Sequence, residues 1–195
     1  MKTGSNLTNN IITLRPTSAA DLNFVIAAEQ HRDNSLFVRQ WSADQHLEAL
    51  EDPNIGHFII VSAYSGNPVG YVILMGLKDR DRSLELRRIV VTDKGKGFGR
   101  QAIRLVKAYA FEQLTCHRLW LDVMLYNKRA AKLYKSEGFT LEGVHREAVR
   151  LGNRYVDVRV MSILRGEYYE RFYHHQTRLL TDSPGAEELS GVTLR

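Results

Sequence analysis

The chain has 195 residues, a formal net charge of +5 and 44% hydrophobic residues, which suit a single globular domain. No apolar run reaches the roughly 20 residues of a membrane-spanning helix, and residues 1–10 lack the apolar core of a secretory signal. Because Cys116 is the single cysteine, an internal disulfide is excluded. We therefore expect a cytoplasmic protein that does not associate with a membrane.

Strand-like and helix-like segments alternate along the chain. The expected strands, in chain order, are 11–15, 56–63, 69–75, 83–91, 118–123, 140–149 and 154–163. The expected helices are 18–30, a short helix from 42 that ends before Pro53, 99–114 and 127–138. The spacings Ser18-x-x-Asp21 and Ser42-x-x-Gln45 favour helix starts, and residues 31–40 remain unassigned. The order of elements predicts one domain over 11–165.

Both ends of the chain differ from this domain. Residues 1–10 are polar, and we expect them to be flexible. Residues 166–195 are expected to form a helical extension and a flexible tail. The extension carries an aromatic stripe at helical spacing, suited to packing or to a contact with another copy: Tyr168, Tyr169, Phe172 and Tyr173.

A glycine-rich loop follows the expected strand 83–91 and opens the next helix. Backbone amides at a helix N-terminus, without bulky side chains, form a site suited to phosphate. Residues 97–102 fit the dinucleotide pattern G-x-G-x-x-A, with Asp122 further on, but the later part of the chain does not continue the strand–helix alternation of that fold. No Walker motif occurs. A plain glycine turn with solubilising lysines is the remaining alternative.

A second motif favours another interpretation of the loop. Lys94-x-x-Gly97-x-Gly99 resembles the pyrophosphate loop [QR]-x-x-G-x-[GA] of the GNAT acetyltransferase superfamily, with Lys94 in place of Gln or Arg. Residues 127–139 resemble that family's N-x-x-A-x-x-L-Y-x-x-x-G-F. The resemblance covers about 11–165 and is strongest to the branch with spermidine and ribosomal-protein N-terminal acetyltransferases. It implies an α/β (α+β) GNAT fold: a mixed, mostly antiparallel sheet with helices on both faces.

The resemblance also implies the function and the cofactor site. We expect an acetyl-CoA-dependent N-acetyltransferase that transfers acetyl directly to a primary amine, with a non-catalytic acetyl-CoA-binding regulatory protein as the alternative. No metal site is expected. The residues expected at acetyl-CoA are Ile89, Val90, Val91, Lys94, Lys96, Gly97, Phe98, Gly99, Arg100, Asn127 and Arg129.

Acetyl transfer to an amine needs a base for the ammonium and a proton donor for the departing thiolate. Glu85 is the candidate base, acting through a water, because related lysine acetyltransferases place their glutamate at the matching point of the strand. The alternative is a surface glutamate paired with Arg87. Tyr134 stands at the tyrosine of the second motif and is the candidate acid. Its alternative is a core tyrosine whose hydroxyl is satisfied.

The acceptor is not identified by the sequence. In the GNAT fold it meets the cofactor between residues 31–51 and 145–154, and a polyamine would need carboxylates there. The carboxylates available to it are Glu29, Asp33, Asp44, Glu48 and Glu51, but Arg32, Arg39, Arg146, Arg150 and Arg154 dilute them. A polyamine, another small amine or a protein N-terminus all remain open, and the protein is a candidate homo-oligomer.

The basic charge does not require nucleic acid. Much of the excess lies near the two motifs, and either the phosphates of CoA or a solvated basic surface would account for it. The residues concerned are Arg87, Arg88, Lys94, Lys96, Arg100, Arg104, Lys128, Arg129 and Lys132. Because no nucleic-acid motif accompanies them, we do not expect a nucleic-acid partner.

Overall fold

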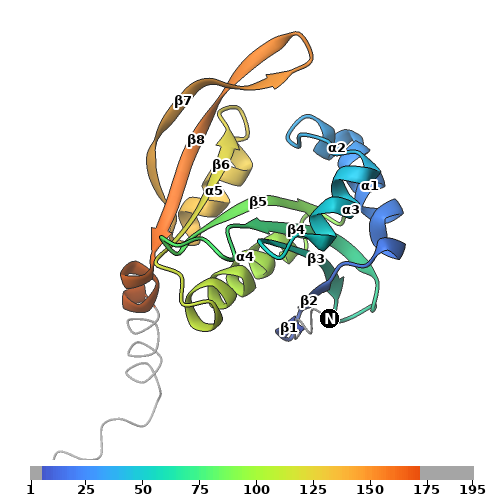
Figure 1. Cartoon of the computed structure of the whole chain (residues 1–195), viewed down its shortest axis with the longest axis horizontal. Coiled ribbons are helices and arrows are strands. Elements are labelled where there is room, and N and C mark those ends of the chain that lie inside the picture. Colours follow the sequence, from blue (N-terminus) through green and yellow to red (C-terminus); the bar gives the residue numbers. More distant parts are fainter. Residues whose placement is uncertain (1–5, 172–195) are drawn as a thin grey trace, which may run out of the picture.

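The computed structural model describes residues 6–171. An eight-stranded sheet in the order β1-β2-β3-β4-β5-β6-β8-β7 forms the centre of the molecule (Figure 1). β5 and β6 run parallel, and the other neighbouring strands are antiparallel. The expected mixed, mostly antiparallel sheet is therefore confirmed.

The first half of the chain supplies five neighbouring strands and the helices that precede β3. Its elements are β1 (Leu7–Thr8), β2 (Ile12–Pro16), the 3-10 turn η1 (Ala19–Asp21), α1 (Leu22–Gln30), α2 (Arg32–Ser35), α3 (Ala43–Glu51), β3 (Ile55–Ser62), β4 (Pro68–Met75) and β5 (Ser83–Val91). Both capping boxes form, at Ser18 with Asp21 and at Ser42 with Gln45. The previously unassigned stretch contains α2, and β1 lies inside the N-terminal stretch that we expected to be flexible.

The second half completes the sheet and adds the helices that flank the glycine loop. Its elements are α4 (Phe98–Ala108), a π-helical turn η2 (Tyr109–Gln113), β6 (Arg118–Met124), α5 (Lys128–Ser136), β7 (Thr140–Leu151) and β8 (Arg154–Leu164). β8 lies between β6 and β7, so the last hairpin returns into the sheet. Residues 165–171 are helical, and Tyr168 stacks on Phe111 with 5.0 Å between ring centroids. Phe172, Tyr173 and the expected tail lie outside the described residues.

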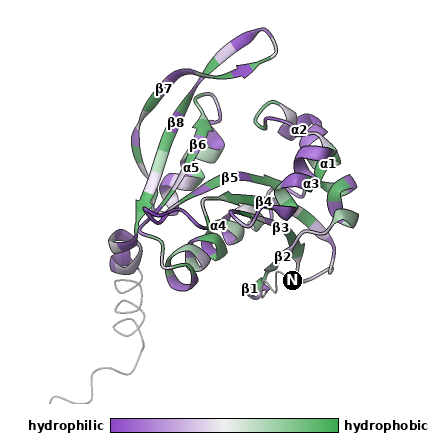
Figure 2. Cartoon of the chain, in the orientation of Figure 1, coloured by the Kyte–Doolittle hydropathy of each residue, from purple (hydrophilic) through white to green (hydrophobic). Residues whose placement is uncertain are grey.

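Each face of the sheet is covered by its own helices. The larger buried cluster includes Ile103 and Val106 of α4 and Tyr134 of α5, packed against the sheet. The smaller includes Val25 of α1 with Tyr71 and Val90 from the strands. The strands β3 and β4 lie between the two clusters and are largely hydrophobic in Figure 2, whereas hydrophobic and hydrophilic residues alternate along the helices. No helix among residues 6–171 is both long and apolar enough to cross a membrane.

A β-bulge at Arg87 changes which face the side chains of β5 meet. Arg88 pairs with Ile73 of β4, but the next pair is Leu86 with Leu74, so Arg87 is the extra residue. Leu86 accordingly packs in the larger cluster, while Val90 packs in the smaller one with α1. Without the bulge, residues four apart on a strand would share one face. The bulge therefore turns Arg88 into the interior beneath α1 and α3.

A buried polar network occupies that interior, around the carboxylate of Glu29. Its side chain is 0% exposed and pairs with the Arg88 guanidinium, 6% exposed. The Tyr71 hydroxyl donates to Glu29 Oε1 at 2.6 Å, and the backbone amide of Trp41 donates to Oε2 at 2.9 Å. Nε2 of His46 lies 3.2 Å from Oε1 as an ion-pair contact, although no partner meets full hydrogen-bond geometry there.

A chain of polar ring contacts continues behind His46. His46 Nδ1 lies 3.2 Å from His57 Nε2, and His57 Nδ1 lies 2.9 Å from the Thr17 hydroxyl. An ionised carboxylate can only accept hydrogen bonds, so the Nε2 atom of His46 that faces Glu29 carries a proton. The contacts of His57 with His46 and Thr17 continue the polar network from Glu29 to β2 and the start of η1.

These contacts shift two pKa values. Burial alone would raise the pKa of Glu29, but its contacts with His46, Tyr71 and Trp41 and the charge of Arg88 lower it overall. Burial, with the nearby His46 and Arg88, lowers the pKa of His57 to about 3. His57 therefore stays neutral in the folded protein where a histidine of the unfolded chain is already protonated.

Stability is therefore expected to fall in mild acid. Between about pH 6.5 and pH 3 the unfolded chain binds a proton that folded His57 does not, so unfolding is favoured as the pH drops. We expect the His57 contribution to reduce the free energy of unfolding by about 2 kcal/mol between pH 7 and pH 5. Urea denaturation at several pH values measures it. His57→Asn should flatten this dependence, and an unchanged slope would contradict the assignment.

Candidate active site

The glycine loop has the backbone conformation of an anion site. Gly95 and Gly97 have positive φ angles of 87° and 80°, and Gly97 is the N-cap of α4. A Cβ at either position would meet no atom within 4 Å, so the conformation, not crowding, favours glycine there. The first amides of α4, from Phe98 onward, have no acceptor within the helix and are available to an anion.

The side chain of Arg100 does not face this loop. Its guanidinium pairs with Glu137 and donates to the Ser136 hydroxyl at 3.0 Å. Arg104 and Lys107 also contact Glu137, which is 5% exposed. The buried carboxylate thus joins α4 to the end of α5. Because its side chain makes these contacts, the backbone amide of Arg100 is the group that remains a candidate for the expected phosphate site.

The other loop candidates differ in their surroundings. Lys94 donates from Nζ to the carbonyl of Asp33 at 2.7 Å, so it reaches from the loop to α2. Burial, with nearby Arg129, lowers the pKa of Lys94, against the opposing effect of Asp33. Lys96 is exposed and pairs with Asp93 at 2.8 Å. Lys94 and Arg129 therefore lie near each other as a basic pair.

The sheet opens between β5 and β6. Their parallel pairing covers Ser83–Glu85 with Arg118–Trp120, and from there each strand continues without the other. β5 stays paired with β4 through Val91, so its other edge beyond Glu85 offers unpaired backbone groups. Ile89 and Val91 pack toward the α4 face, and Val90 packs toward α1. This open edge suits an extended ligand that adds to the sheet like a strand.

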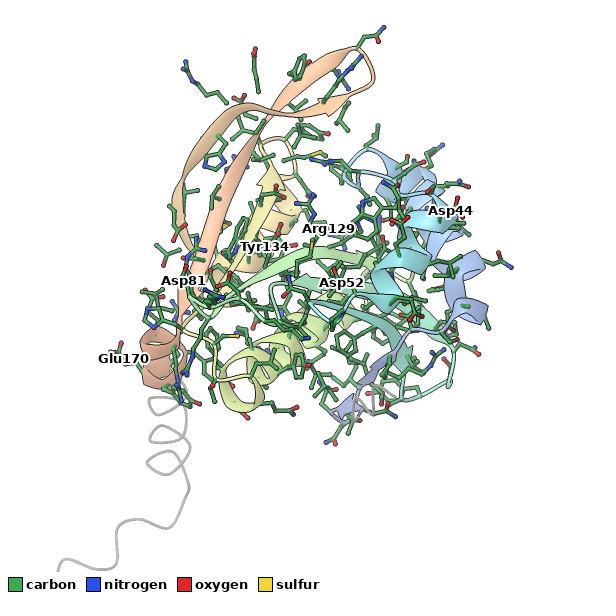
Figure 3. The ribbon with its side chains drawn as sticks, viewed as in Figure 1. Asp44, Asp52, Asp81, Arg129, Tyr134 and Glu170 are labelled. Atoms are coloured by element: carbon green, nitrogen blue, oxygen red, sulfur yellow. The ribbon has the colours of Figure 1, made fainter. Side chains whose placement is uncertain are left out.

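Asn127 and Tyr134 lie on the α5 side of this opening. The Asn127 side chain accepts from the amide of Ala130 at 3.1 Å and caps α5, as expected. Tyr134 is 8% exposed, and burial together with the charge of Asp122 raises its pKa. Its hydroxyl has no hydrogen-bond partner among residues 6–171 and is therefore available to a ligand, and the raised pKa keeps it protonated at neutral pH. Figure 3 places Tyr134 and Arg129 in the middle of the molecule.

Glu85 is the last paired residue before the strands separate. Its carboxylate pairs with Arg87 at 3.0 Å, which is the contact of the alternative interpretation. The side chain is 13% exposed and therefore only partly removed from water. Its register partner on β6 is Trp120, and Asp122 follows two residues later, about 6.6 Å along the strand. Glu85 and Asp122 thus border the opening from opposite strands.

Two expectations, one for the acceptor and one for the cofactor, are wrong. Glu29 was counted among the carboxylates available to a substrate, but it is fully buried and bound by its own network. Arg88 was counted with the cofactor charges, but it is the ion-pair partner of Glu29. Sequence reasoning missed both because the bulge that turns Arg88 inward leaves no pattern in the residue types. Asp44 lies on the outer side of α3, away from Tyr134 (Figure 3).

The β7–β8 hairpin extends beyond the body of the molecule (Figure 1) and carries a second acidic feature. Its register shifts between His145 and Val149, and Glu147 there has a positive φ of 49°. The amide of Glu147 donates to Asp157 Oδ1 at 2.8 Å. A hollow of about 580 Å³ is lined by Arg146, Glu147 and Asp157. The hairpin wall of the expected acceptor region therefore offers two carboxylates beside Arg146.

Comparisons with known proteins identify the family. Residues 22–139 match the Acetyltransferase (GNAT) family. The spermidine N(1)-acetyltransferase of Vibrio cholerae is 31% identical over 171 residues, which span 84% of this chain and 98% of that protein.

Two solved structures of spermidine N-acetyltransferase from Vibrio cholerae are similar throughout most of their length. The complex with CoA and spermine superposes with a TM-score of 0.74 at 29% identity, covering 83% of this chain and 99% of that one. A dodecameric structure in an intermediate state gives 0.71 at 29% identity, with 84% and 99% covered. The glycine loop, the open edge of β5 and these relatives together lead to one conclusion: the chain belongs to the acetyltransferase (GNAT) family and is an acetyl-CoA-dependent N-acetyltransferase.

Proposed function

We propose that this enzyme acetylates a primary amine of a polyamine, with acetyl-CoA bound in the opening between β5 and β6. The observation that supports this placement most is the end of β5–β6 pairing at Glu85, next to the amides that open α4. The pantetheine arm would pair with the free edge of Ile89–Val91. The pyrophosphate would lie on the amides of Gly97–Arg100, with Lys94, Lys96 and Arg129 near the phosphates and Asn127 beside pantetheine.

The proposed chemistry is direct transfer. The amine is mostly protonated at neutral pH, so it must lose a proton before it attacks the thioester carbonyl. Glu85 takes this proton through a water. The new C–N bond forms as the C–S bond breaks, and the Tyr134 hydroxyl gives its proton to the departing sulfur. The raised pKa of Tyr134 supports this role, because the group stays protonated until the thiolate develops.

Two observations support a polyamine as the acceptor. The relatives that align over nearly their full length are spermidine acetyltransferases. In this chain, Glu85 and Asp122 border the opening, and Glu147 and Asp157 line the hollow of the hairpin. An acceptor with several ammonium groups would use one carboxylate near the acetyl group and another further away. The arginines near the hairpin reduce the acidic surface that an acceptor can use. We expect this effect to be larger than any effect that they have on the binding of a monoamine.

We also propose a homo-oligomer, supported by the dodecameric relative. Size-exclusion chromatography with light scattering tests it, and a monomer at micromolar concentration would contradict it. A cytoplasmic location remains our proposal, supported by the free, buried thiol of Cys116.

The first experiment is an amine panel with protein and acetyl-CoA, followed by mass spectrometry. The panel holds spermidine, spermine, monoamines and peptides with a free N-terminus. A mass increase of one acetyl group on the polyamines is the expected result. Acetylation of the peptides but not of the polyamines would overturn the acceptor class and leave the enzyme class unchanged.

Tyr134→Phe should lower kcat by about 100-fold or more, because it removes the proton donor but keeps the ring. The dissociation constant of acetyl-CoA should change by less than about twofold, since binding does not depend on that proton. Steady-state kinetics and calorimetry measure the two quantities. An unaltered kcat would remove Tyr134 from the mechanism.

Gly97→Val should abolish measurable acetyl-CoA binding. A β-branched residue is strained at positive φ and would distort the amides at the start of α4. Gly66→Val is the matched control, because Gly66 has a φ of 69°, equally open surroundings and a place in the distant β3–β4 turn. Calorimetry should show normal binding for Gly66→Val. Equal loss in both variants would point to unfolding, and normal binding to Gly97→Val would refute the loop assignment.

Asp157→Asn should raise KM for spermidine about fivefold, which corresponds to about 1 kcal/mol, while KM for a monoamine stays unchanged. The asparagine keeps an oxygen for the amide of Glu147, so the hairpin should retain its shape. Asp44→Asn, on the outer side of α3, is the control and should change neither KM. The same KM for spermidine in both variants would exclude the hairpin carboxylates from the acceptor site.

A further inference from the structure

The segment Leu36–Trp41 connects α2 to α3 and borders the expected acceptor region. Three donors bind backbone carbonyls, spaced three residues apart, in this segment and just before it. Lys94 donates to the carbonyl of Asp33, just before the segment, at 2.7 Å. The Tyr126 hydroxyl donates to the carbonyl of Leu36 at 2.6 Å, and Arg88 donates to that of Arg39. Three different elements thus fix its position.

Glu29 and Arg88 both contact the C-terminal end of this segment. Arg88 donates to the carbonyl of Arg39, and its guanidinium carbon lies 4.5 Å from the centre of the Trp41 ring. Glu29 accepts from the amide of Trp41 at 2.9 Å through Oε2, while Oε1 pairs with Arg88. A planar guanidinium can make these contacts together because its donors point in fixed directions.

Arg88 also has a particular place on β5. It directly precedes Ile89, whose strand edge faces the opening, and the bulge at Arg87 directs it to the opposite side from α4. The same short stretch of strand therefore carries the edge proposed for pantetheine and the side chain that holds Arg39. Any shift of this stretch would move cofactor and segment together.

We propose that Arg88 is a positioning residue for acetyl transfer: through Arg39 and Trp41 it sets the segment Leu36–Trp41, and with it the acceptor, at a fixed distance from the acetyl-CoA edge of β5. This inference rests on the proposed placement of acetyl-CoA. It assigns to the buried pair a role in acceptor binding, besides its contribution to the core. Orientation of the reactants is a large component of catalysis, so a loosened acceptor wall lowers turnover as well as affinity.

The test must separate positioning from stability. Arg88→Met alone leaves the carboxylate of Glu29 buried without its cation, which is strongly destabilising. The double variant Glu29→Gln/Arg88→Met removes both charges, keeps an amide oxygen for the backbone amide of Trp41 and places an NH2 group that can donate to the Tyr71 hydroxyl. We expect it to recover most of the lost stability, because removal of a whole buried pair is often close to neutral.

The double variant should nevertheless remain defective with the acceptor. We expect KM for spermidine to rise about tenfold, while the dissociation constant of acetyl-CoA stays within about twofold of the original. Amide hydrogen exchange of residues 36–41 should become faster, since the carbonyl of Arg39 has lost its donor. The single variant Arg88→Lys should also show the raised KM for spermidine and the faster exchange of residues 36–41. One ammonium group cannot replace the several donors of the guanidinium, which point in fixed directions.

Tyr71→Phe is the matched control within the same network. It removes one donor to Glu29 at 2.6 Å but leaves the contacts with Arg39 and Trp41 in place. It should lower stability without changing KM for spermidine or the exchange of residues 36–41. If KM for spermidine rose in proportion to the loss of stability in every variant, including Tyr71→Phe, the proposal would be overturned.

Two further outcomes distinguish this inference from the proposed function. Normal exchange of residues 36–41 in the double variant would overturn the positioning role, whatever the acceptor proves to be. Loss of acetyl-CoA binding in the double variant, with slow exchange retained, would also overturn it and would question the placement of the cofactor on β5 instead.

Discussion

The separation of β5 from β6 is the constraint on which the rest of this structure depends. Backbone groups in a sheet interior are normally paired, and here one edge of β5 is released after Glu85, while β4 still holds the other. The strand then ends in a loop whose glycines lead into α4, so an extended ligand can follow the edge and end at helix amides. Glu85 lies where this pairing ends, and Tyr134 lies on α5, the helix that follows β6.

Two buried carboxylates join elements that surround this opening. Glu137 forms ion pairs with three basic side chains of α4 and so joins that helix to the end of α5. Glu29 does the same on the opposite face, where it binds Arg88 and the amide of Trp41. A buried charge is costly unless its partners are close, so each cluster specifies one arrangement of the elements that it joins. The basic residues of the chain are therefore partly structural.

Local patterns were sufficient for most of the elements. The strand 83–91, both capping boxes and the asparagine cap of α5 depend on neighbours within a few residues, and all occur as expected. The two motifs identified the family for the same reason, since each is a short loop or helix start. Roles for Glu85, Tyr134 and the loop residues remain predictions, although the structure brings their elements together around one opening.

The sequence by itself determined the order of elements, through periodicity and caps, and it determined the class of fold, the family and the use of acetyl-CoA through the resemblance of two contiguous motifs to the GNAT family. Only the tertiary structure decided what individual charged side chains contact. Whether Arg88, Arg100 and Glu29 face a ligand or a buried partner depends on a one-residue bulge and on side chains far away in the chain. Contacts over such separations follow from packing, which residue types along one strand or helix do not reveal.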